Sequence, residues 1–223
     1  LEQGESAELK KKAAVRVLER RFTETPESFL PLAGMFDSGK NDTRLTETVI
    51  RLSDFSMSEP SPRDWLERIR EQFEAVSADE SIWGKKLTDE VCFDLSYCIY
   101  LSDAALKDIE EDEELSAGYL GLFCSENTIL KDTADNVKSA LWDEKIALVK
   151  HARDIIKSSR LPSLPRGYSD NPSKLSAQAK RNEIKDVLDK IIEYFNITDA
   201  DNRDDLPVIG AIASELIDTV IEY

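Results

Sequence analysis

The sequence predicts an all-α fold, an irregular bundle of roughly eight to ten helices. Apolar residues recur three and four positions apart along most of the chain, and no stretch of useful length alternates as a strand would. The 223 residues include only eight glycines and eight prolines, which disfavours a turn-rich β architecture. The apolar fraction of 41% suffices for a buried core, although the net charge is −16. We expect one helical domain over residues 1–223 or, within it, two sub-lobes over 1–123 and 124–223.

In the first third of the chain the apolar spacing predicts four helices, over residues 5–22, 26–36, 44–58 and 62 to about 76. The third helix repeats apolar side chains at i, i+4, i+7 and i+10, namely Leu45, Val49, Leu52 and Phe55. Pro26 and Pro62 support two of the helix beginnings, because proline suits a first helical turn whose N–H groups have no partner.

Further helices are predicted over residues 82–108, roughly 115–123, roughly 126–158, roughly 174–195 and from near Leu206. The longest irregular segment is 160–173, which is rich in Pro, Ser, Gly and Asn. The polar, acidic stretch Asp199–Asp205 is expected to precede the last helix.

Targeting signals are not visible in the sequence. No stretch has the length of apolar sequence that crosses a bilayer, and the polar N-terminal residues do not form a signal peptide. Cys92, Cys98 and Cys124 are odd in number and show no CxxC spacing, so we interpret them as buried free thiols in a reducing compartment. The sequence therefore predicts a cytoplasmic protein with no membrane contact.

Two motifs approach known sites and then depart from them. Gly34–Asn41 matches GxxxxGK, but Asn41 replaces the hydroxyl that holds magnesium, and the preceding residues predict a helix, not a strand. Asp199–Asp205 begins like a calcium loop but lacks the turn glycine and the final glutamate. His151 is the only histidine, so the sequence does not favour metal sites built from several histidines or catalysis by a Ser-His-Asp or Cys-His arrangement. We predict no catalytic, cofactor-binding or metal-binding residue in this chain.

Charge is unevenly distributed along the chain. Residues 145–185 include ten Lys or Arg and three Asp or Glu, whereas the remainder is strongly acidic. Lys150, Arg153 and Lys157 share one helical face, and such a stripe could meet DNA phosphates. The alternative is that it docks on the acidic part of the same chain or on a partner. The candidate phosphate contacts are Lys150, Arg153, Lys157, Arg160, Arg166, Lys180 and Arg181.

The segment Phe29–Phe73 resembles the AddA/RexA family, the A subunits of the ATP-dependent helicase/nuclease AddAB (also called RexAB), which are UvrD-like superfamily 1 helicases. The family pattern "L…I..L.DF..S.P.P..WL" is met by Leu45, Ile50, Leu52, Asp54, Phe55, Ser58, Pro60, Pro62, Trp65 and Leu66. Trp142, the stretch Ser159–Pro162 and the charged helix Lys180–Lys185 are also similar to this family, so the resemblance runs along nearly the whole chain.

The resemblance implies that the chain is the inserted helical subdomain 1B of the first motor domain. That subdomain would be non-catalytic and would help to position double-stranded DNA. The parent would be an ATP-dependent DNA helicase and exonuclease in double-strand-break repair and recombination. Its Walker A loop would precede Leu1 and its Walker B motif would follow Tyr223. Partners would be the rest of the parent chain and an AddB/RexB-type subunit, with ATP and Mg in the parent only. The alternative function is a helical protein–protein interaction module with no nucleic-acid contact.

Overall fold

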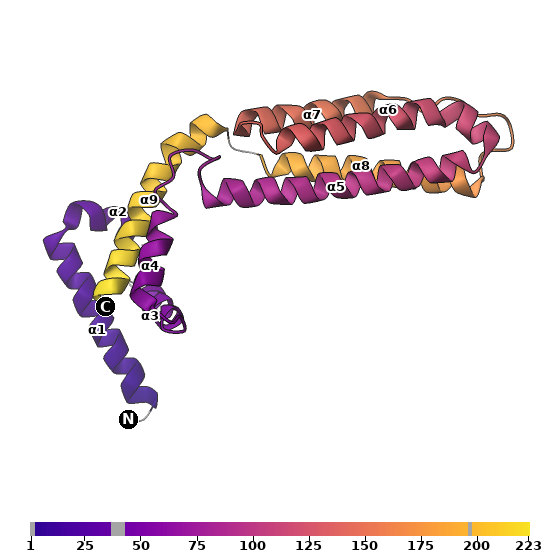
Figure 1. Cartoon of the computed structure of the whole chain (residues 1–223). Helices are drawn as coiled ribbons and strands as arrows, with labels where there is room; N and C mark the ends of the chain where they lie inside the picture. The colour runs from indigo at the N-terminus through magenta and orange to yellow at the C-terminus, as the bar shows by residue number, and fades with distance from the viewer. Residues whose placement is uncertain (1–2, 37–42, 196–197) are drawn as a thin grey trace. The chain divides into compact units, whose positions relative to one another are not determined.

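The computed structural model describes residues 3–36, 43–195 and 198–223, which are helical almost throughout (Figure 1). Nine helices and no strand occur in these ranges, which confirms the predicted all-α class. The chain divides into two compact units, residues 1–81 with 200–223 and residues 82–199. Neither unit ends at residue 123, where the sequence suggested a subdivision, because one helix runs unbroken through that position, α6 (Glu113–Val137).

The first unit packs five helices around a small apolar core. They are α1 (Gln3–Glu24), α2 (Pro26–Phe36), α3 (Thr43–Ser56), α4 (Pro62–Glu71) and α9 (Asp199–Glu222). The apolar stripes of α2, α3, α4 and α9 meet in one buried cluster, against which Leu18 of α1 packs, made of Phe29, Leu32, Leu45, Val49, Leu66, Ile217 and Val220. Ion pairs attach α9 at its edges: Arg21 Nη2 lies 2.7 Å from Glu215 Oε1, and Arg70 Nη1 lies 2.9 Å from Asp218 Oδ1.

A close backbone approach also joins α4 to α9 in this unit. A Cβ atom on Gly210 would lie 2.4 Å from the carbonyl oxygen of Phe73, which follows the end of α4. Only glycine leaves room for this approach, because the obstructing atom belongs to the backbone and cannot rotate away.

The last helix begins seven residues earlier than the sequence predicted, at Asp199 and not near Leu206. Pro207 therefore lies inside α9, where it removes one backbone hydrogen bond. Acidic residues in the first turn favour the early start, because the helix N-terminus carries partial positive charge. Asp199 itself belongs to the second unit, and its backbone N–H donates to Asp143 Oδ1 of the same unit at 3.0 Å.

The second unit is a four-helix bundle of α5 (Ile82–Glu110), α6, α7 (Trp142–Ser158) and α8 (Pro172–Glu193). Each helix packs chiefly against two others, so that α5, α6, α7 and α8 follow one another around the bundle, with α6 and α7 along one side and α5 and α8 along the other (Figure 1). The centre is filled by apolar side chains from all four helices, including Val91, Leu95, Leu130, Val137, Val149, Ile156, Leu188 and Ile191.

The break between α6 and α7 lies later than the sequence predicted. The predicted helices 115–123 and 126–158 are instead Glu113–Val137 and Trp142–Ser158. Residues 124 and 125 contain no helix breaker, whereas α7 has a start signal of its own. There Glu144 Oε2 accepts a hydrogen bond from the backbone N–H of Leu141 at 3.0 Å.

An irregular segment, residues 159–171, links α7 to α8 and covers one end of the bundle. Its apolar side chains Leu161, Leu164 and Tyr168 pack on a buried cluster of Ala105, Ile109, Leu115, Tyr119, Phe123 and Ala177. This linker therefore supplies part of the core where α7 has already ended.

Asp112 ties the linker to the starts of two helices. Its carboxylate accepts hydrogen bonds from the backbone N–H of Leu115 at 3.0 Å, from Tyr168 Oη at 2.9 Å and from Asn171 Nδ2 at 3.1 Å. Asn171 Oδ1 in turn accepts from the backbone N–H of Lys174 at 2.9 Å and caps α8. The Leu115 hydrogen bond, with help from Tyr168 and Asn171, lowers the pKa of Asp112 below its ordinary value.

We predict that Asp112→Asn makes the chain less stable at neutral pH and removes part of its acid sensitivity. Because the folded pKa of Asp112 is depressed, its contribution is fully present above the ordinary carboxyl pKa of 3.8. That contribution disappears as the pH falls through the lower folded pKa. Urea unfolding between neutral pH and about pH 3 should show the difference between the two proteins shrinking with acidification. A difference that is constant with pH would contradict the prediction.

We also predict that Gly210→Ala destabilises the first unit by about 1–3 kcal/mol, because the new methyl group overpacks against the Phe73 carbonyl. Gly34→Ala is the matched control, since a Cβ there meets nothing within 4 Å. In that open helical position alanine should stabilise by up to about 1 kcal/mol. Hydrogen exchange of α4 and α9 would measure both effects, and equal protection in the two variants would count against the steric argument.

Candidate nucleic-acid interface

The four-helix unit is electrostatically divided between its helices. α5 carries six acidic and three basic residues, and α6 carries five acidic and one basic residue. Residues 142–193, which form α7, the linker and α8, carry eleven Lys or Arg and eight Asp or Glu, so this part of the bundle is slightly basic. A polyanion would therefore be attracted to the α7–α8 side and repelled by α5 and α6.

The stripe predicted on α7 is present but partly neutralised. Lys150 is exposed and forms no ion pair with another described residue. Arg153 Nη1 lies 3.3 Å from Asp189 Oδ1 on α8, and Lys157 Nζ donates to Asp189 Oδ2. These contacts, that of Lys157 first, hold the pKa of Asp189 below its ordinary value. Asp154 also lies 2.6 Å from Arg153 Nε. Lys157 keeps 42% of its side chain exposed, so Lys150 and Lys157 remain accessible.

Arg160 and Arg166 extend this cationic surface onto the linker. Both side chains are exposed, and neither forms an ion pair within the described part of the chain. The packing of Leu161 and Leu164 into the apolar cluster anchors the backbone that carries them. We call Lys150, Lys157, Arg160 and Arg166 the accessible cations.

Lys180 lies on a different side of α8 from Asp189, because it faces α5 and not α7. Its Nζ is 2.5 Å from Asp108 Oδ2 and 2.6 Å from Ser176 Oγ. The structure therefore does not bring Lys180 together with the α7 stripe, and its charge is balanced by α5.

Arg181 is buried, with only 4% of its surface exposed. Its guanidinium forms a bidentate pair with Glu126 of α6, with contacts of 2.6 and 2.8 Å, and donates to the carbonyls of Ile156 at 2.8 Å and Ser159 at 2.9 Å. These hydrogen bonds are all directed into the bundle, so Arg181 organises helix ends and presents no surface to a ligand.

Lys185 joins the cationic side, although the candidate set predicted from the sequence omits it. It lies one turn after Arg181 on α8 and is half-buried. Burial, together with the charges of Arg181 and Lys157, lowers the pKa of Lys185. The i, i+4 spacing from Arg181 was the signal that could have suggested it.

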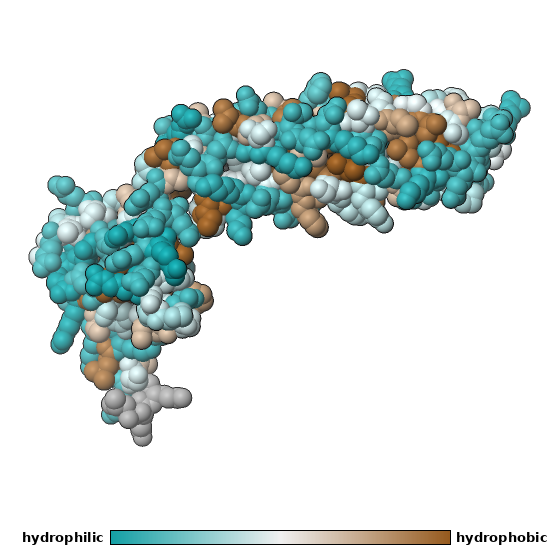
Figure 2. Space-filling view, in the orientation of Figure 1, coloured by the Kyte–Doolittle hydropathy of each residue, from teal (hydrophilic) through white to brown (hydrophobic). Residues whose placement is uncertain are grey.

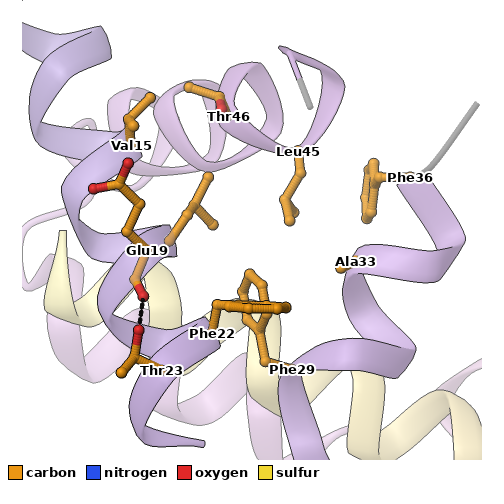
Figure 3. A pocket seen from close by; sticks show the side chains of 10 residues that line it. Val15, Glu19, Phe22, Thr23, Phe29, Ala33, Phe36, Leu45 and Thr46 are labelled. Atoms are coloured by element: carbon orange, nitrogen blue, oxygen red, sulfur yellow. Dashed lines mark hydrogen bonds between the residues drawn. The ribbon is translucent and has the colours of Figure 1, made fainter. Parts of the chain in front are cut away.

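The first unit contains an apolar cavity of about 440 Å³ between α1, α2 and α3 (Figure 3). The rings of Phe22 and Phe29 meet edge to face across it, with centroids 6.3 Å apart. Glu19 is the one charged side chain among the described lining residues, and its backbone carbonyl accepts from Thr23 Oγ1 at 2.8 Å. These described residues offer no pairing of a nucleophile with a base.

In the residues that it describes, the structure agrees with the rejection of both motifs. Phe29–Ala33 lies within helix α2, which confirms that no strand precedes the GxxxxGK-like stretch; positions 37–42 lie outside the described residues. Asp199–Asp205 forms the first turns of α9 and not a loop. Among the described residues no three His, Cys, Asp or Glu side chains gather as metal ligands would. None of the described helices has the length and apolarity that a bilayer span requires.

These observations define a class: an all-α segment whose accessible cations lie on one helix, α7, and on the linker that follows it. No family model matches the chain. The A subunit of the ATP-dependent helicase/nuclease from Clostridium novyi is 31% identical over 203 residues, covering 88% of this chain and 16% of that protein. The corresponding proteins of Clostridium kluyveri and Clostridioides difficile are 27% and 24% identical and cover 98% and 100% of this chain.

The chain is thus a homologue of a segment of the A subunit of the ATP-dependent helicase/nuclease, as its sequence motifs indicated. It spans about a sixth of the length of the curated relatives it matches, since coverage of the three is 16–18%.

We predict that Arg181→Met destabilises the bundle by about 3–5 kcal/mol, because Glu126 is left as an unpaired buried charge. Replacing both residues, as in Arg181→Met with Glu126→Leu, should cost less than either single change. Lys180→Met is the control, since it breaks a pair that retains about a quarter of its exposure (24% and 26%). Urea unfolding followed by circular dichroism measures every variant. The prediction fails if Arg181→Met is no more harmful than Lys180→Met.

Proposed function

We propose that this chain is the 1B accessory region of an AddA/RexA-type helicase/nuclease and that its α7–linker surface guides duplex DNA beside the motor. The relatives' names supply the helicase and nuclease context. The observation that carries the proposal is the set of accessible cations, Lys150, Lys157, Arg160 and Arg166, on α7 and the linker of a bundle whose α5 and α6 are net acidic. Such residues contact phosphates and position DNA without reading its sequence.

The chemistry of strand unwinding and cleavage is assigned to other parts of the parent protein. In this proposal ATP and Mg²⁺ bind outside residues 1–223, and an AddB/RexB-type subunit completes the enzyme. The ion pairs that neutralise Arg153 and Lys180 support a limited electrostatic role, because a surface built to grip DNA would leave those charges unpaired.

The test compares two variants of the intact parent enzyme with equal changes of net charge. Lys150→Glu with Arg160→Glu reverses two accessible cations. Lys11→Glu with Lys85→Glu reverses two exposed lysines outside α7, α8 and the linker. Both pairs leave the buried Arg181 network intact, so both proteins should fold.

We expect the first variant to bind duplex DNA more weakly and to unwind it more slowly. The slope of log affinity against log salt should fall by about one for each phosphate interaction removed, because each such interaction releases condensed counterions. The control variant should retain the slope of the wild-type enzyme. If both variants keep that slope, the surface does not contact phosphates, and the helical protein-interaction function becomes the better explanation.

A further inference from the structure

The outward face of α5 carries a row of exposed aromatic side chains. Phe93, Tyr97 and Tyr100 follow one another at i, i+4 and i+7, with 70%, 38% and 67% of their surfaces exposed. The rings of Tyr97 and Tyr100 are nearly parallel, with centroids 6.4 Å apart. In Figure 2 apolar side chains project from the edge of this unit where α5 lies in Figure 1. A contiguous aromatic surface of this kind is typical of interaction sites.

Two carboxylates lie next to this row, one before its first ring and one beside its middle ring. Glu90 precedes Phe93 by one turn on the same side of α5. Tyr97 Oη donates to Glu183 Oε1 of α8 at 2.5 Å, which places a second carboxylate beside the rings. Lys86 and Lys107 lie two turns beyond the two ends of the row. Because Glu90 and Glu183 place two carboxylates beside the rings, this face favours a cationic ligand.

The chain itself shows the chemistry that such a face selects. Lys190 of α8 holds its ammonium 5.6 Å from the ring centroid of Tyr194, and 3.5 Å from the buried Oδ2 of Asp94 on α5. A cation there meets an aromatic face and a carboxylate together. The exposed aromatic row with Glu90 and Glu183 repeats this combination on a larger scale.

We propose that the aromatic row of α5 docks a Lys- or Arg-bearing segment from elsewhere in the same parent protein. One cationic head would lie over Phe93 and pair with Glu90, a second would lie over Tyr100, and their aliphatic stems would cover the rings. The relatives provide the source of such a segment, because about five-sixths of their length lies outside the region that this chain matches. The proposal is independent of the DNA contact on α7 and the linker.

The experiment places a photo-crosslinking residue in the intact parent protein, as Phe93→p-benzoylphenylalanine and, separately, Tyr100→p-benzoylphenylalanine. Leu141→p-benzoylphenylalanine is the control, because Leu141 is 65% exposed but lies at the start of α7. Crosslinked peptides are identified by mass spectrometry, with and without duplex DNA. Each substitution is at an exposed position, so circular dichroism should show unchanged helix content.

We expect positions 93 and 100 to crosslink to one common stretch of the parent protein, and we expect that stretch to contain at least two Lys or Arg. Adding Glu90→Lys should lower the yield about tenfold, since it places like charges together. Glu110→Lys, the same charge change on the opposite side of α5, should not. Crosslinks to DNA, to another protein chain, or to a stretch without basic residues would overturn the proposal. So would a yield no higher than that from position 141.

Discussion

The arrangement of the bundle depends on a guanidinium that has almost no access to water. Arg181 of α8 pairs with Glu126 of α6 and donates to two carbonyls at the end of α7, those of Ile156 and Ser159. A buried ion pair survives only when its remaining hydrogen-bonding groups are also satisfied, because desolvation of both charges is costly. The hydrogen bonds of Arg181 therefore hold α6, α7 and α8 relative to one another. Those to Ile156 and Ser159 also hold the end of α7 in place.

The end of α7 determines what the cationic surface looks like. Because α7 stops at Ser158, the bundle beyond it is closed by a linker and not by a fourth helix. Leu161, Leu164 and Tyr168 point into the core, so the polar residues between them, Arg166 among them, lie outside. Hydrogen bonds from Tyr168 and Asn171 to Asp112 secure the far end of the linker. The packing of the linker's apolar side chains into the core thus places its charged side chains on the surface.

Helical spacing in the sequence predicted the all-α class and, for α2, both ends of the helix. It misplaced the α6–α7 break and the start of α9, because those boundaries depend on single contacts such as Glu144 with Leu141 and Asp143 with Asp199. The sequence predicted the candidate site from the high density of Lys and Arg in residues 145–185. Its division into accessible and neutralised residues was not, since Asp108, Glu126 and Asp189 are distant in sequence from the cations they pair with.

This division bears on what the surface could contribute to DNA handling. Four accessible cations, each contacting one phosphate, give a salt slope of at most roughly 3.6, since Lys157 must first leave Asp189, so affinity would fall at most about 150-fold between 50 and 200 mM salt. A protein with six to ten phosphate contacts has an affinity that falls roughly a thousandfold or more over the same range. The smaller contribution suits a surface that aligns a duplex already held by a motor, because it adds direction without slowing release. The net acidic helices α5 and α6 also help to align the duplex, because their repulsion restricts where on the bundle it can lie.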